Sequence, residues 1–177
     1  MNDAPRRPGR DESAEYYFTY IDQTPAGDIR DLLATQGLET VNFLRGISDQ
    51  RSLHRYAPDK WSIRDVVAHV TDTERVFVYR ALWFARGFSA PLPSFDQNVG
   101  VAGARADNRD WNDLVGEFSA VRDATARFFR SLAADAWDRR GIASDKPFTV
   151  RALAFITYGH VAHHNKVLHE RYLATAQ

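Results

Sequence analysis

Apolar residues recur every three or four positions along four long segments of this chain, at about residues 27–45, 62–86, 110–132 and 150–173. This spacing places the apolar side chains of each segment on one face of a helix. No segment alternates apolar and polar residues for long enough to form a strand. Helices with one apolar face bury it against one another, so the sequence predicts an all-α four-helix bundle.

Helix-capping and helix-breaking residues mark the ends of the second helix. The Ser62 side chain can cap its amino end, and Asp65 lies favourably near the positive end of the helix dipole. At the other end, Gly87 and Pro91 forbid continuation of the helix. We therefore expect an extended loop over residues 87–97.

The length of 177 residues is that of one domain. Residues 1–15 are rich in proline, arginine and acidic residues and almost lack apolar ones, so we expect a disordered N-terminal tail. Residues 16–177 then form a single bundle domain. Within it, residues 133–148 are expected to form a short extended excursion before Thr149 caps the fourth helix.

The composition excludes several classes of site. The chain has no cysteine, so it has no disulfide, no thiolate nucleophile and no cysteine-based zinc or iron–sulfur site of its own. Any metal must be held by histidine and carboxylate side chains. The 23 basic and 23 acidic residues balance, which argues against nucleic acid as a partner.

Membrane and secretory signals are also missing from the sequence. The most apolar stretch, residues 66–84, contains four charged residues and is too polar to cross a bilayer. The N-terminal residues carry charges of both signs and have no apolar core, unlike a secretory signal. We therefore expect a protein with no membrane partner and a cytoplasmic location.

The histidines of the fourth helix are the strongest chemical signal. His160 and His164 lie four residues apart in GHVAHH, so both project from one face of the helix and can share one metal ion. His163 shares a face with His160 at a spacing of three, and spacing alone leaves the pairing open. On the second helix, His69 lies among valines that turn it toward the interior, which makes it the third candidate ligand. Three imidazoles with an open fourth position are typical of a catalytic metal site.

Less specific interpretations remain open for the same residues. A single buried histidine is more often a hydrogen-bonded core residue than a ligand, and a histidine pair at this spacing also occurs on solvent-facing surfaces. His54 and His169 are expected to be ordinary surface residues. The bundle could also be a metal-binding or stress-associated helical dimer without catalysis, or a scaffold that binds no ion.

Other polar residues near the predicted site are candidates for supporting roles. Asp72 lies one turn after the candidate ligand of the second helix and could shuttle a proton, orient a ligand or face solvent. Glu74 is expected to point elsewhere. Arg80, Asp96 and Gln97 could line the mouth of the site, although Arg80 could instead pair with an acid on the next helix.

Three motifs in a fixed order carry a resemblance to a known family. They are KWSIRDVVAHVTDTERVFVYRAL (residues 60–82), FDQ (residues 95–97) and TVRALAFITYGHVAHHNKVLHERYL (residues 149–173). Together they resemble the DinB-like superfamily, and they are most similar to its metal-dependent hydrolases of the YfiT kind. The likeness spans about residues 29–173.

The resemblance implies an up-down-down-up bundle in which His69, His160 and His164 bind a divalent metal near one end. The expected ion is zinc or nickel, with manganese or iron as alternatives. The resemblance also implies a homodimer that acts on a small molecule, either as a hydrolase or as a transferase that uses a low-molecular-weight thiol. In a chain without cysteine, the sulfur would come from such a cofactor.

Overall fold

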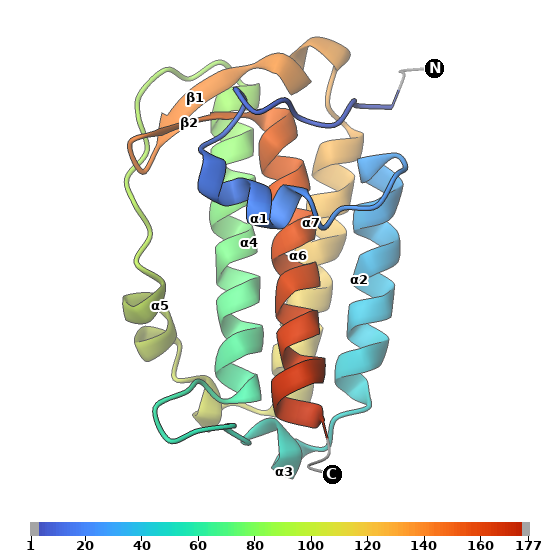
Figure 1. The fold of residues 1–177 in the computed structure, drawn as a ribbon, viewed down its shortest axis with the longest axis vertical. Helices are drawn as coiled ribbons and strands as arrows, with labels where there is room; N and C mark the ends of the chain where they lie inside the picture. Colours follow the sequence, from blue (N-terminus) through green and yellow to red (C-terminus); the bar gives the residue numbers. More distant parts are fainter. Residues whose placement is uncertain (1–3, 175–177) are drawn as a thin grey trace.

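The computed structural model describes residues 4–174 of the chain. Four long helices form the bundle: α2 (Ile29–Arg45), α4 (Ile63–Ala85), α6 (Trp111–Arg130) and α7 (Val150–Val167). Helices α4 and α6 run in one direction and α2 and α7 in the other, which is the up-down-down-up order (Figure 1). The predicted all-α bundle is therefore confirmed. None of the helices in the described part of the chain has the length and apolar character that crossing a bilayer requires.

Side-chain caps hold the amino ends of the bundle helices. At α4, Ser62 accepts from the Asp65 N–H, and the Asp65 carboxylate accepts from the Ser62 N–H in return. Thr149 caps α7 as the sequence predicts, and Asp28 and Asp110 cap α2 and α6. Each cap satisfies N–H groups that the helix itself leaves without a partner, which typically stabilises the fold by about 1 kcal/mol.

The apolar core is divided into two clusters along the bundle. One cluster surrounds the carboxyl half of α4 and the amino half of α7, and it includes Phe84 and Leu153. The other surrounds the amino half of α4 and includes Phe118 of α6. Between them, at positions 71–74 of α4 and 157–160 of α7, the buried side chains are polar. A polar layer therefore crosses the bundle between two apolar cores.

An ion-pair network in this polar layer joins the four bundle helices. Arg122 of α6 donates to the Glu74 carboxylate of α4 at 2.6 and 3.1 Å, and to the Gln36 side-chain oxygen of α2 at 2.9 Å. Gln36 in turn donates to the backbone oxygen of Tyr158 on α7 at 3.0 Å. Gly37 makes room for the network, because a Cβ there would lie 2.5 Å from Arg122 Cγ. This close approach explains a glycine in the middle of α2, where it weakens the helix.

Short elements around the bundle are the part of the fold that helical periodicity did not predict. The α4–α6 crossover is extended as far as Asp96, which then caps the short helix α5 (Gln97–Ala104). The excursion before α7 forms an antiparallel hairpin of β1 (Arg140–Ala143) and β2 (Lys146–Thr149). The other short elements are η1 (Glu15–Tyr17), α1 (Phe18–Ile21), α3 (Asp49–Ser52), η2 (Ala106–Asn108), η3 (Ala134–Asp138) and a π-helical turn, η4 (Leu168–Leu173).

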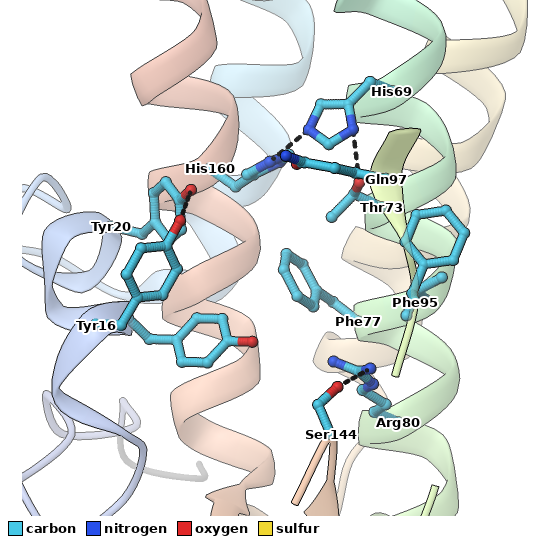
Figure 2. A pocket seen from close by; sticks show the side chains of 12 residues that line it. Tyr16, Tyr20, His69, Thr73, Phe77, Arg80, Phe95, Gln97, Ser144 and His160 are labelled. Carbon is cyan, nitrogen blue, oxygen red and sulfur yellow. Dashed lines mark hydrogen bonds between the residues drawn. The ribbon is translucent and has the colours of Figure 1, made fainter. Parts of the chain in front are cut away.

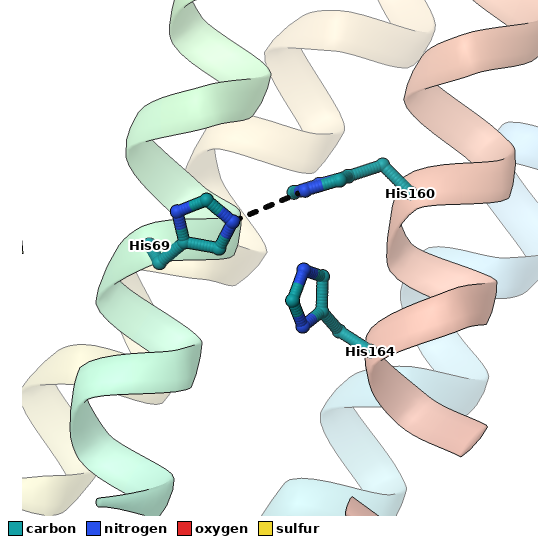
Figure 3. Close-up of side chains that lie close together, drawn as sticks. All are labelled: His69, His160 and His164. Atoms are coloured by element: carbon teal, nitrogen blue, oxygen red, sulfur yellow. Dashed lines mark hydrogen bonds between the residues drawn. The ribbon is translucent and has the colours of Figure 1, made fainter. Parts of the chain in front are cut away.

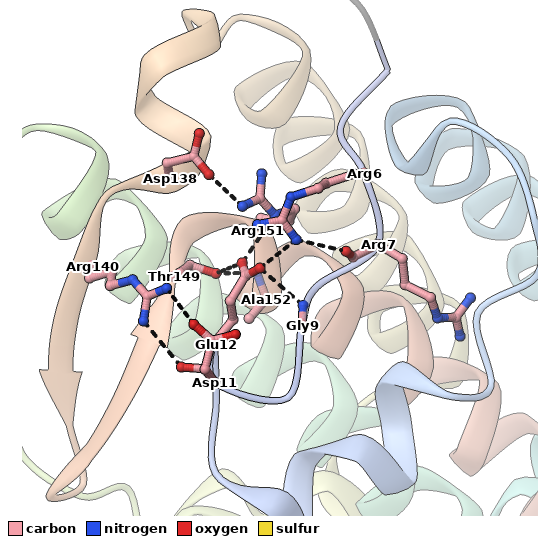
Figure 4. Close-up of polar contacts among 10 residues, drawn as sticks. All are labelled: Arg6, Arg7, Gly9, Asp11, Glu12, Asp138, Arg140, Thr149, Arg151 and Ala152. Carbon is pink, nitrogen blue, oxygen red and sulfur yellow. Dashed lines mark hydrogen bonds and ion pairs between the residues drawn. The ribbon is translucent and has the colours of Figure 1, made fainter.

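Residues 4–15 differ from the disordered tail that the composition predicts. They pack along the hairpin end of the bundle, and the Glu12 carboxylate is buried there (Figure 4). It accepts hydrogen bonds from Thr149 Oγ1 at 2.8 Å and from Arg151 Nε at 3.0 Å. Apolar content alone does not indicate that a carboxylate is buried at the amino end of α7. Residues 1–3 of the predicted tail lie outside the described residues.

Glu12→Gln is expected to make the protein less stable at neutral pH and less sensitive to acid. Burial raises the pKa of Glu12, but hydrogen bonds from the Gly9 N–H and from three side chains outweigh burial and lower this pKa from 4.5 to about 2. Because the pKa is depressed in the folded state, the carboxylate stabilises the fold above pH 4.5, and this contribution is lost as the pH falls toward 2. We expect the variant to lose about 3 kcal/mol of unfolding free energy at pH 7, measured by urea unfolding, and less at pH 3.

Glu15→Gln is the matched control for this experiment. Glu15 is exposed and pairs with Arg10 across the surface, so its removal should leave both the stability and its pH dependence close to those of the wild type. If Glu12→Gln lost the same free energy at pH 7 and at pH 3, the buried carboxylate would not be the source of the acid sensitivity.

Candidate metal centre

Three histidines meet where α4 and α7 face each other (Figure 3). His69 comes from α4, and His160 and His164 come from successive turns of α7. The Nε2 atoms of His69 and His160 are 3.2 Å apart. One ring nitrogen of each histidine lies within 4.8 Å of those of the other two. This group, named here the three-His cluster, contains the histidines that the sequence singles out and, within residues 4–174, no carboxylate.

The closest pair of nitrogens in the three-His cluster has the spacing that a single divalent ion requires. Metal–nitrogen bonds of about 2.0–2.1 Å in a tetrahedral arrangement place neighbouring ligand nitrogens about 3.3 Å apart. The 3.2 Å separation between His69 and His160 is close to this value. The protein also leaves one ring nitrogen of the cluster without a partner. Nδ1 of His164 is buried and has no hydrogen bond in the described part of the chain.

Burial keeps the three imidazoles uncharged at neutral pH. It lowers the pKa of His69 to about 4 and that of His164 to about 3. It also lowers the pKa of His160 well below its usual value, and repulsion from the neighbouring histidines adds to this effect. A neutral imidazole has the free lone pair that a metal requires. Thr73 Oγ1 lies 3.3 Å from Nδ1 of His69, and such a contact orients the ring so that Nε2 faces the cluster.

His163 lies beside the three-His cluster but is not part of it. Its ring packs edge-on against Tyr20 and His164, with centroids 5.6 and 5.1 Å away. The structure thus groups His164, and not His163, with the other two candidates. Of the remaining histidines, His54 is half-buried in the loop before α4, and His169 is exposed near the end of the chain.

A cavity of about 140 Å³ extends from the cluster toward the carboxyl half of α4 (Figure 2). His69 and His160 lie at one end of it, and Arg80 lies about three turns further along α4. We refer to it as the Arg80 cavity. Its lining residues are Tyr16, Tyr17, Tyr20, His69, Thr73, Val76, Phe77, Arg80, Phe95, Gln97, Ser144 and His160.

Segments outside the bundle form much of the wall of the Arg80 cavity. Three tyrosines come from η1 and α1, Gln97 comes from the crossover, and Ser144 comes from the turn of the hairpin. The sequence allowed a place for Arg80 and Gln97 at the mouth of the site, with an ion pair to the next helix as the alternative for Arg80, and it gave no sign of the tyrosines and Ser144. The run EYYFTY (residues 15–20) is a visible aromatic signal, but its spacing does not indicate which part of the bundle it covers.

Gly159 allows α1 to lie directly on α7 next to the three-His cluster. A Cβ at this position would lie 2.0 Å from the backbone oxygen of Tyr20. The Tyr20 ring packs edge-on against His160, with centroids 5.3 Å apart. This close approach covers the cluster on that side and explains the glycine that precedes His160 in the GHVAHH motif.

A second cavity, of about 400 Å³, reaches the cluster from the amino end of α4. We refer to it as the Lys60 cavity. Its lining residues are Tyr56, Asp59, Lys60, Trp61, Val66, His163, His164, Val167, Arg171 and Tyr172. Because His69 and His160 line the Arg80 cavity and His164 lines the Lys60 cavity, the three-His cluster lies between the two.

The candidate acidic residues lie away from the cluster. Asp72 pairs with Arg75 at 2.9 Å on the outside of the bundle. Glu74 is buried against Arg122, and Asp96 caps α5. None of these three carboxylates lines either cavity. This geometry does not support the proton shuttle considered for Asp72, nor a place for Asp96 at the mouth of the site.

Solved structures of known proteins share this fold. YfiT from Bacillus subtilis, a probable metal-dependent hydrolase with an unusual four-helix bundle topology, superposes with a TM-score of 0.63 at 15% identity, covering 93% of this chain and 92% of its own. The mycothiol-dependent maleylpyruvate isomerase superposes with a TM-score of 0.67 at 13% identity over 82% of this chain, which spans 61% of the isomerase chain. The DinB-like protein YjoA from Bacillus subtilis gives 0.58 at 17% identity, covering 85% and 95% of the two chains.

Sequence comparison gives the family directly. Identities as low as those of the solved structures establish a common fold and not a common activity. A search of curated protein sequences finds no match. The sequence profile of the DinB superfamily, however, matches residues 14–168, which span the four bundle helices and the three-His cluster. The chain therefore belongs to the DinB superfamily.

Proposed function

We propose that the three-His cluster binds a divalent metal ion and that the protein is a metal-dependent enzyme acting on a small molecule. The observation that carries this proposal is the convergence of three histidine side chains between two cavities. Three protein ligands leave a coordination position for water or a reactant, as in catalytic sites, whereas a structural site is closed by a fourth protein ligand.

The residues of the cluster would hold zinc or nickel, with manganese or iron as alternatives, because imidazole is a ligand that these metals accept. When bound, the ion would supply Lewis-acid activation that lowers the pKa of water or of a thiol at the open position. Thr73 would keep the His69 ring in its binding orientation. Tyr20 and Phe77 pack edge-on against His160, with centroids 5.3 and 5.7 Å away, and exclude bulk water from that side.

The two cavities favour a reaction between two molecules that meet at the cluster. A low-molecular-weight thiol in one cavity and an electrophile in the other would make the protein a thiol transferase, and the sulfur would come from the cofactor because the chain has no cysteine. Water in place of the thiol would make it a hydrolase. Proteins of this fold include a mycothiol-dependent maleylpyruvate isomerase and YfiT, a probable metal-dependent hydrolase. A homodimer, a cytoplasmic location and the lack of a nucleic-acid partner remain predictions from the sequence.

A metal-binding bundle without catalysis is the competing proposal, and turnover separates the two. Metal-loaded protein would be assayed with simple esters and amides, and with electrophiles in the presence of each common bacterial thiol. We expect turnover that requires the metal and is lost in His69→Ala, whereas His54→Ala, outside the cluster, keeps it. Full metal occupancy without metal-dependent turnover across this panel would instead favour a storage or sensing site.

A further inference from the structure

Arg80 differs from the other buried arginines of this protein. The buried arginines of the described chain are Arg64, Arg80, Arg122 and Arg151. Three of them form ion pairs with carboxylates: Arg64 with Asp49, Arg122 with Glu74, and Arg151 with Glu12 and Asp138. Arg80 is 4% exposed, yet it forms no ion pair with a carboxylate anywhere in residues 4–174. A buried cation without an anionic partner is costly, so its retention points to a partner that the chain does not supply.

Neutral groups hold the Arg80 guanidinium at the end of the Arg80 cavity (Figure 2). Its Nη2 donates to the Pro93 backbone oxygen at 3.1 Å and to Ser144 Oγ at 2.9 Å. Burial lowers the pKa of Arg80, and the Tyr17 hydroxyl beside it partly offsets this effect. An arginine nevertheless stays protonated in proteins. The cavity therefore carries one positive charge that its own walls do not neutralise.

We propose that Arg80 binds the carboxylate of a small organic acid whose other end reaches the three-His cluster. This inference rests on the proposed function and names its substrate class. A guanidinium forms short, charge-assisted hydrogen bonds with a carboxylate. Arg80 is the one permanently charged residue that lines the cavity, which suits a monoanion better than a phosphate dianion. The apolar walls, Val76, Phe77 and Phe95, suit the carbon skeleton of such an acid.

The spacing along α4 also limits the shape of the acid. Arg80 follows His69 by eleven residues, which is close to three full turns and about 16 Å along the helix axis. The two side chains therefore face the same way but are well separated. An acid that touches both must be elongated, with its reacting group far from the carboxylate. Arg80 then determines specificity and positions the substrate, whereas the reaction takes place at the cluster.

The first test uses metal-free protein, so that its result does not depend on whether the metal proposal is correct. Straight-chain carboxylates of four to eight carbons and the matching neutral amides would be titrated by calorimetry. We expect wild type to bind at least one carboxylate tenfold or more tightly than its amide, and Arg80→Gln to lose this preference. Arg86→Gln, exposed just beyond the end of α4, should keep it. No preference for carboxylate over amide at any length in wild type would overturn the proposal.

The second test adds the metal. Monohydroxamates of the four- to eight-carbon dicarboxylic acids carry a metal-chelating group at one end and a carboxylate at the other. With metal-loaded wild type, the free carboxylate should add at least tenfold in affinity over its methyl ester at one or two chain lengths. Arg80→Gln should lose this gain, and Arg80→Lys, which keeps the charge but not the planar fork, should keep part of it.

The outcomes of the two tests separate the two proposals. If the hydroxamates bind but the carboxylate adds nothing at any length, the Arg80 proposal is overturned while the metal site stands. If wild type prefers carboxylates in the first test but neither retains metal nor binds hydroxamates, the metal proposal fails while the role of Arg80 stands. Circular dichroism and melting temperatures show whether each variant is folded. If Arg80→Gln does not fold, Arg80→Lys serves as the test variant in its place.

Discussion

Replacing Arg122 with methionine is expected to lower the free energy of unfolding by about 3–5 kcal/mol, because it leaves a buried carboxylate without its cation. Glu74 is 1% exposed, and its Oε1 already has no hydrogen-bond partner in the described chain. Gln36 would also lose the donor to its side-chain oxygen. Since these groups lie in the polar layer that joins the bundle helices, the loss should appear as a lower midpoint in urea unfolding.

Two further variants separate the charge effect from packing. In Glu74→Leu/Arg122→Met, both charges are replaced by apolar side chains, and most of the lost stability should return. Arg127→Met removes an exposed ion pair with Asp123 and should leave the unfolding transition close to that of wild type. If Arg122→Met lost less than about 0.5 kcal/mol, as ordinary surface substitutions do, the network would not be holding the helices together.

His160→Ala is expected to weaken metal binding by more than about 100-fold, because losing even the hydrogen-bond partner of a ligand typically costs 10–100-fold. The His160 ring is central to the cluster, with ring centroids 5.0 Å from His69 and 4.6 Å from His164. Competition with a chromophoric chelator would measure the affinity of wild type and variant for zinc and for nickel.

His163→Ala is the matched control for metal binding. His163 lies on the same helix and contacts the cluster from outside, so its loss should change the affinity far less than that of His160. Equal affinities in the two variants would show that the cluster is not the binding site. A larger effect of His163→Ala would revive the alternative pairing that the spacing of the histidines allows.

The bundle could be predicted from the sequence because its determinants are local. Apolar residues at helical spacing set the four long helices, and caps such as Ser62 and Thr149 set where two of them begin. Each of these signals lies within a few residues of the structure that it specifies. The bounds of α4 consequently agree with the expectation to within one residue. Helix α7 begins where expected, but it ends at Val167, and the last six residues of the expected helix form the π-helical turn η4.

The segments that cover the bundle could not be predicted in this way, because distant residues determine their positions. Residues 4–15 are held by the pairing of Glu12 with Arg151, which is 139 positions away in sequence. Helix α1 lies against α7 because Gly159 has no side chain to keep the Tyr20 backbone away. Neither contact leaves a periodic or compositional signal, so the composition of this segment, which is poor in apolar residues, predicts a disordered tail instead.

The candidate site was partly predictable for the same reason. His69, His160 and His164 could be selected from helical spacing and from the family resemblance, but only the packing of α4 against α7 separates His164 from His163. For Arg80, the sequence allowed either a place at the site or an acid on another helix as its partner. Which charges meet across a bundle depends on the relative orientation of the helices, and local sequence signals do not specify that orientation.

X-ray absorption at the metal edge, on protein stripped with a chelator and reloaded with zinc, tests the three-His site most directly. The predicted result is one ion per chain bound by three imidazole nitrogens at about 2.0–2.1 Å, with a further light atom from solvent. His69→Ala and His164→Ala should each lose this signature, whereas His163→Ala should keep it. Failure to retain one zinc per chain, or an unchanged imidazole signal in His69→Ala, would contradict the proposed site.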